Sequence, residues 1–166
     1  MTNIATCIEK LRSLPDWIPY LAQESNLPGP RGNLELAHAV AQIGSREQFE
    51  QLLGYQAAET NTPQEFLLFC GVLGLGKLVA EGELTQLPRL RGYASDPRWR
   101  IREAVATGLQ LVGDRNMEFL LQEVSAWSKG NWLEKRAAAA ALADPRLLRQ
   151  TEAARKALTI LDSITE

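Results

Sequence analysis

The chain has 166 residues, 45% of them hydrophobic and 23% charged, which suffices for one buried core beneath a solvated surface. Its N-terminus has no basic segment followed by an apolar run, and no stretch approaches the roughly 18 apolar residues of a membrane span, so we expect a cytoplasmic protein without a membrane partner. The formal net charge is −2, but the charges are unevenly distributed. Residues 1–85 carry 5 basic and 10 acidic side chains, whereas residues 86–156 carry 13 basic and 8 acidic ones. Only the second segment is therefore suited to binding a polyanion.

Helix starts are legible along the chain, because a side-chain oxygen at the N-cap satisfies free backbone amides and proline is tolerated at the next position. Each start leads into a periodicity of 3.6 residues, and no run of β-branched and aromatic residues lies between turn dipeptides. The sequence therefore predicts an all-α protein. In chain order, the predicted N-caps are Asn33, Ser45, Thr62, Asp96, Asn131 and Asp144, the last of which is expected to open the final long segment.

The helical segments repeat with a period of 33 residues in the second half of the chain. Trp99 then aligns with Trp132 and Leu109 with Leu142, while Val40 aligns with Leu109 at an offset of 69. Repeats of this length are typical of helix pairs that bury their apolar faces only against neighbouring pairs. We expect a right-handed α-solenoid of four to five such pairs, of about 33 residues each, with the second helix of each pair lining a concave surface.

Residues 96–109 resemble the second helix of a HEAT repeat at Asp96-Pro97, Ile101-Arg102, Val105 and Leu109. With Trp99, Trp127 and Trp132, residues 86–148 also resemble the bacterial HEAT-like alkylation-repair DNA glycosylases and their uncharacterised relatives. The resemblance implies a single HEAT-like repeat domain over residues 1–166. It also implies DNA held against a basic concave face by aromatic side chains, with a carboxylate near the lesion. Because the apolar stripe of the last helix continues to Ile164 without a following Gly or Pro, a fragment of a longer chain is a further expectation.

The helix predicted from Pro97 to Val112 should direct Ile101 and Leu109 to the core and Trp99, Glu103, Ala106 and Gln110 to the opposite face. One repeat later, the corresponding residues are Trp132, Arg136, Ala139 and Ala143. The two indoles either pack into the interfaces between repeats, as buried aromatic residues usually do, or form a binding strip. The binding strip is supported because tryptophan and arginine dominate binding hot spots and also bind bases and phosphates. The candidate partner-binding residues are Trp99, Trp132, Arg98, Arg100, Glu103, Lys135 and Arg136.

Two functions fit these residues. The first is a non-enzymatic scaffold that recognises a protein or peptide on its concave helical face. The second is a nucleic-acid-binding protein related to alkylated-base DNA glycosylases, in which Glu103 is the catalytic candidate that stabilises a sugar oxocarbenium ion. The structural alternative for Glu103 is an ion pair with Arg136 one repeat along. We favour the scaffold, because DNA affinity depends on phosphate neutralisation and the whole chain is acidic.

Other patterns give no support for a cofactor, a nucleotide or a metal. Residues 71–77 match G-x-x-x-x-G-K, but Leu78 replaces the Ser or Thr that holds magnesium, and the stretch continues a helix that starts at Thr62. His38 is the only histidine and has no cluster of ligands beside it. Cys7 and Cys70 lie outside any C-x-x-C motif, and we expect both to be reduced core thiols.

Overall fold

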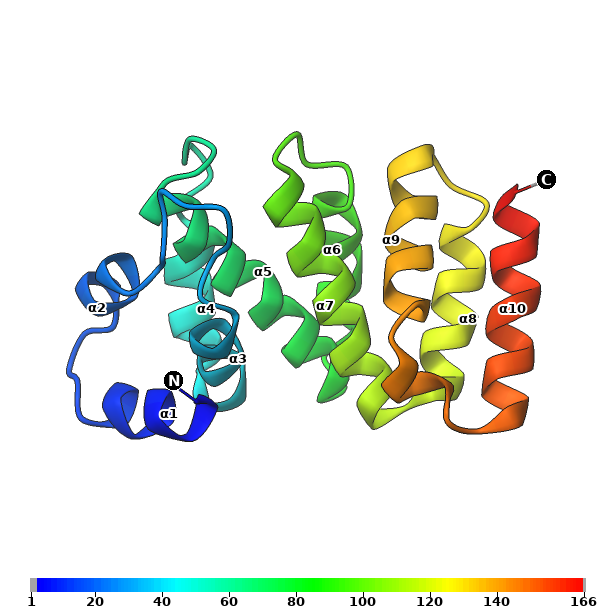
Figure 1. The fold of residues 1–166 in the computed structure, drawn as a ribbon, viewed down its shortest axis with the longest axis horizontal. Coiled ribbons are helices and arrows are strands. Elements are labelled where there is room, and N and C mark those ends of the chain that lie inside the picture. The colour runs from blue at the N-terminus through cyan, green and yellow to red at the C-terminus, as the bar shows by residue number, and fades with distance from the viewer. Residues whose placement is uncertain (1–2, 166) are drawn as a thin grey trace. The chain divides into compact units, whose positions relative to one another are not determined.

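A computed structural model describes residues 3–165, in which 73% helix and the lack of any β-strand confirm the predicted all-α class. Figure 1 colours the helices in chain order, from blue near the N-terminus to red near the C-terminus. The chain divides into two compact units, one ending at Gly74 and the other beginning at Leu75. This boundary falls inside a single long helix, so each unit contains part of that helix.

The first unit contains α1 (Ile4–Arg12), α2 (Ile18–Gln23), α3 (Leu34–Ile43), α4 (Arg46–Leu53) and the first part of α5 (Pro63–Ala80). Three predicted N-caps are confirmed here, because the side chains of Asn33, Ser45 and Thr62 accept hydrogen bonds from the backbone N–H three residues ahead. The helices enclose an apolar core in which Phe49 is buried beside Gly44 and Gly74. Both cysteines are free and buried, as predicted.

The central helix α5 is continuous over its 18 residues. Residues 71–77 are therefore helical and do not form a phosphate-binding loop. By length and composition α5 could cross a membrane, so the expectation that no stretch approaches a membrane span is wrong on these criteria. However, 78% of this helix is buried inside the protein, which is typical of a core helix.

The second unit continues with the short 3-10 helix η1 (Leu84–Gln86), α6 (Leu87–Tyr93), α7 (Trp99–Arg115), α8 (Met117–Trp127), α9 (Trp132–Leu142), the 3-10 helix η2 (Pro145–Leu148) and α10 (Thr151–Thr165). Helix α7 packs on both α8 and α9, and α8 packs on α10. Figure 1 shows α8 and α10 side by side. Asn131 caps α9 with a full capping box, which confirms the N-terminus predicted there.

Three predicted details are wrong in the second unit. Helix α7 begins at Trp99 rather than Pro97, because Asp96 accepts a hydrogen bond from the backbone N–H of Arg98 and forms a turn before the helix. Asp144 opens only the four-residue η2, and α10 starts at Thr151. Ala106 is buried rather than exposed, since neighbouring helices cover a wide arc of α7.

Candidate binding surface on α7 and α9

Trp99 and Trp132 are both accessible to solvent. Trp99 is 46% exposed and Trp132 is 78% exposed. Each is the first residue of its helix, following an N-cap residue with an extended backbone. A side chain there projects toward the N-terminal end of the helix, beyond the packed turns. These exposures contradict a fully buried seam plug, a role that suits Trp127, which is completely buried on α8.

An ion pair connects these two helices and shows their register. Arg136 on α9 donates to the Glu103 carboxylate on α7, and the two residues are 33 positions apart in the sequence. Trp99 precedes Glu103 by four residues, as Trp132 precedes Arg136, so each indole lies one turn before the same bridge. Gln110 Nε2 also donates to Ala140 O at 3.3 Å, so α7 and α9 run in the same direction.

Each indole has a cation from its own helix beside it. The Arg100 guanidinium lies 4.6 Å from the centre of the Trp99 ring, and Lys135 Nζ lies 5.2 Å from the centre of the Trp132 ring. Lys135 is only partly buried, whereas Arg100 is 8% exposed. The accessible surface at the indoles therefore combines two aromatic rings with the half-exposed Glu103–Arg136 ion pair and with the positive charge of Lys135 next to Trp132.

Arg98 and Arg100 do not supply the accessible charge that the sequence suggested. Arg98 binds both carboxylate oxygens of Asp96, at 2.8 and 2.7 Å, with side chains that are 12% and 9% exposed respectively. Burial by itself would raise the pKa of Asp96, but the hydrogen bonds and charge of Arg98 outweigh it and hold that pKa below its ordinary value. Arg98 therefore stabilises the turn before α7, and Arg100 is buried beside the Trp99 ring, so neither lines an accessible surface.

Glu103 adopts the structural alternative, the ion pair with Arg136, and both side chains are half-exposed. A carboxylate paired with a guanidinium is poorly suited to stabilising a developing positive charge. Arg102, one of the residues on which the resemblance to a HEAT repeat was based, donates to the backbone oxygens of Asp96 and Pro97 at 2.8 and 3.0 Å. It therefore holds the turn before its own helix and is not a surface ligand.

Sequence reasoning missed the cluster that holds the start of α9. Arg91 on α6 binds Glu134 through two hydrogen bonds of 3.1 and 3.0 Å, and its guanidinium lies 5.6 Å from the centre of the Trp127 ring. The hydrogen bond from Arg91 is the main reason why the pKa of Glu134 is lowered. Glu134 also accepts a hydrogen bond from the backbone N–H of Asn131. Its position in a capping box was therefore the one feature of the sequence that indicated a role for Glu134 at this helix start.

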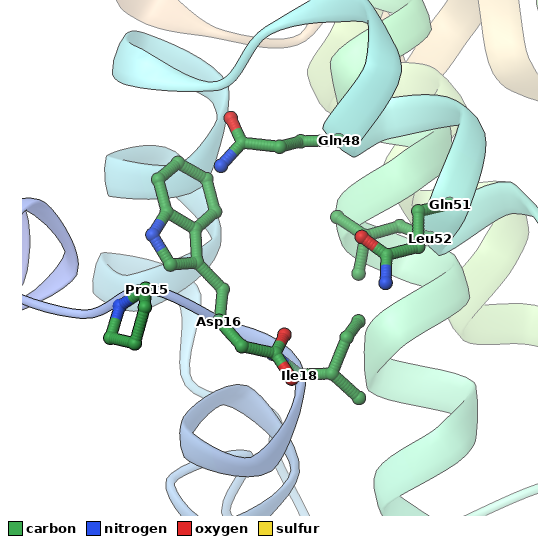
Figure 2. Close-up of a pocket in the computed structure, with 7 residues that line it drawn as sticks. Pro15, Asp16, Ile18, Gln48, Gln51 and Leu52 are labelled. Carbon is green, nitrogen blue, oxygen red and sulfur yellow. The ribbon is translucent and has the colours of Figure 1, made fainter.

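The first unit contains a small open pocket of about 100 Å³. Figure 2 shows Gln48, Gln51 and Leu52 of α4 on one side and Pro15, Asp16 and Ile18 on the other. Trp17 also lines this pocket, but its indole N–H already donates to Leu11 O at 2.9 Å. Small-molecule sites usually enclose roughly 300 Å³ or more, so this pocket is a weak candidate. Among residues 3–165, no group of three or more His, Cys, Asp or Glu could hold a metal ion.

No family model, curated protein or solved structure matches this chain. The resemblance to HEAT-like repeats and to alkylation-repair glycosylases therefore stays a prediction.

Proposed function

We propose that this protein is a non-enzymatic binding scaffold that recognises an extended segment of a protein partner across the first turns of α7 and α9. The observation that carries the proposal is the exposure of Trp99 and Trp132 at equivalent positions of two helices in register. Large aromatic side chains at the centre of an interface contribute most of its binding energy, whereas an exposed indole contributes little to folding.

The proposal includes a right-handed α-solenoid of HEAT-like helix pairs, with α7 and α9 as second helices on its concave face. Contacts inside the second unit support this arrangement. Helices α7 and α9 contact each other, α8 contacts α10, and Arg91 of α6 contacts Trp127 of α8. Two alternating rows of helices are what stacked pairs require.

Nucleic-acid binding, with or without base excision, is the second candidate, and the exposed indoles favour it because bases stack on aromatic rings. The charges favour the scaffold. Arg98 is paired with Asp96, Arg100 is buried, and Arg136 is paired with Glu103. Lys135 is then the predicted contact residue with the most freedom to bind a phosphate, and one cation neutralises little of a polyanion.

The test is to select peptides from a random 12-residue phage library on the wild-type protein and to measure their affinities by fluorescence anisotropy. Trp132→Ala should weaken the selected peptides by about 30-fold, which corresponds to about 2 kcal/mol. Its free energy of unfolding should change by less than about 1 kcal/mol, because the indole is mostly solvated. A core tryptophan such as Trp127 would cost about 3 to 5 kcal/mol when truncated.

Leu158→Ala is the matched control, because Leu158 is a large apolar side chain on α10 that is 65% exposed. It should leave the peptide affinities unchanged. If Trp132→Ala and Trp99→Ala also leave them unchanged, the indoles do not form the binding surface. If either variant unfolds at markedly lower denaturant concentration, the indole is part of the architecture and the assignment is wrong.

A further inference from the structure

The distance between the two indoles limits the shape of a ligand that can contact both of them. Trp99 and Trp132 each precede the Glu103–Arg136 bridge by one turn. The two indoles are therefore separated mainly by the distance between the helix axes, with little displacement along these axes. Contacting helices lie about 8 to 10 Å apart. We take the interval between the two rings to be roughly the same, since each ring leaves its helix at the equivalent first position.

From this interval, and resting on the proposed function, we infer that the partner segment is a proline-rich strand in the polyproline II conformation with prolines three residues apart. A polyproline II helix rises about 3.1 Å per residue with three residues per turn, so like residues recur about every 9.3 Å on one face. An extended β-strand instead repeats on one face at about 6.6 Å, which does not match the helix spacing. Consecutive P-x-x-P prolines thus fall on successive indoles.

The indole N–H groups also favour a ligand in the polyproline II conformation. Within residues 3–165, neither Trp99 nor Trp132 donates its indole N–H to a protein acceptor, whereas Trp17 does so to Leu11 O. Polyproline II has no internal hydrogen bonds, so its backbone carbonyl groups point outward and are free to accept. A tryptophan ring beside such a strand can pack on proline and donate to a carbonyl at the same time.

Charge determines the flanking residues of the ligand. Each ring already has a cation beside it, Arg100 at Trp99 and Lys135 at Trp132, so a further lysine or arginine in the ligand is repelled. An acidic residue next to the proline on Trp132 would instead pair with Lys135. The ligand is therefore a P-x-x-P segment with acidic rather than basic flanks.

The test uses four fluorescein-labelled peptides of 12 residues and fluorescence anisotropy. The first contains repeated P-A-A-P spacing with glutamate flanks, the second has the same composition with prolines two residues apart, the third has them four apart, and the fourth has lysine flanks. The first should bind at least 10-fold more tightly than each of the others. Trp99→Ala and Trp132→Ala should each weaken it by at least 10-fold, while Leu158→Ala has no effect.

Lys135→Ala should reduce the preference for glutamate over lysine flanks, since only Arg100 then remains beside the rings, and should retain the preference for spacing. The inference is overturned if the P-A-A-P peptide does not saturate below about 1 mM, or if it binds no better than the peptides with altered spacing. If library-selected peptides without proline then bind in a manner that depends on Trp132, the proposed scaffold function stands and only the ligand class is wrong. If no peptide of either kind depends on Trp132, both fail.

Discussion

The ion pair of Asp96 and Arg98 stabilises the turn that determines where α7 begins, and so the position of Trp99. The pair lies in the turn before α7. Asp96 accepts one hydrogen bond from the Arg98 backbone N–H and two from its guanidinium, and these hold the turn that precedes Trp99 at the first helical position. Removal of one partner from a mostly buried pair leaves the other charge without compensation. The stability of this turn therefore depends on the ionisation of Asp96.

We predict that the stability contributed by Asp96 is lost at acid pH. Its pKa in the folded protein is below its ordinary value of 3.8, so the contribution is present above that value and falls as the pH drops through the folded pKa. Asp96→Asn should lower the free energy of unfolding by about 2 kcal/mol at pH 7 and should flatten its decline between pH 5 and pH 2.

Urea unfolding followed by circular dichroism measures both effects. Asp162→Asn, at an exposed position on α10, is the control and should behave like the wild type. An unchanged pH dependence in Asp96→Asn would contradict the assignment.

Sequence periodicity predicted part of the accessible face of α7 and failed at Ala106, at Arg100 and at Arg98 just before the helix. The 3.6-residue period placed Trp99 and Glu103 correctly on an accessible face, and the 33-residue offset anticipated the pairing of Glu103 with Arg136. Arg98 precedes the helix, so its direction is set by the Asp96 turn and not by the period. Arg100 is buried and its guanidinium lies beside the Trp99 ring, a contact that no spacing rule specifies.

At the scale of helices, N-caps were predicted better than helix lengths. Side-chain oxygens at Asn33, Ser45 and Asn131 act locally, and a local rule is sufficient to find them. The break between η2 and α10 was missed because an Asp-Pro pair opens a 3-10 turn as readily as a long helix. Helices α1 and α2 were not predicted, since no Asp-Pro or capping-box signal marks residues 1–32.

Close helix packing in the second unit depends on a pair of glycines. A Cβ atom on Gly76 of α5 would lie 2.3 Å from Gly108 Cα of α7, so the backbones must separate to admit any larger residue. We predict that Gly76→Ala lowers the free energy of unfolding by about 2 to 3 kcal/mol, measured by urea denaturation.

Gly92→Ala is the matched control for this substitution. Gly92 lies within α6, and a Cβ there would meet nothing within 4 Å. The control should be neutral or stabilise the protein by up to about 1 kcal/mol, because alanine favours helix more than glycine does. Equal effects of the two substitutions would show that helix propensity, and not the crossing of α5 and α7, controls stability.

At the scale of the whole molecule, the distribution of charged residues distinguishes a protein-binding scaffold from a nucleic-acid-binding protein. Residues 1–74 carry 4 basic and 8 acidic side chains, whereas residues 75–166 carry 14 basic and 12 acidic ones. Several of the basic residues in the second unit already bind carboxylates, including Arg91, Arg146 and Lys156. The excess of positive charge that can reach a phosphate backbone is therefore small.

We predict that a fluorescein-labelled 20-base-pair duplex binds with a Kd on the order of 10 to 100 μM in 50 mM NaCl and not measurably in 200 mM NaCl. Nonspecific DNA binding depends on the release of counterions, so its affinity falls steeply with salt. Lys135→Ala should weaken the low-salt binding, whereas the affinity for a peptide with neutral flanks should persist at 200 mM NaCl, because it depends on apolar contact with the indoles. Submicromolar duplex binding with little salt dependence, together with release of an alkylated base that Glu103→Gln abolishes, would instead identify a glycosylase-like enzyme and overturn the scaffold function.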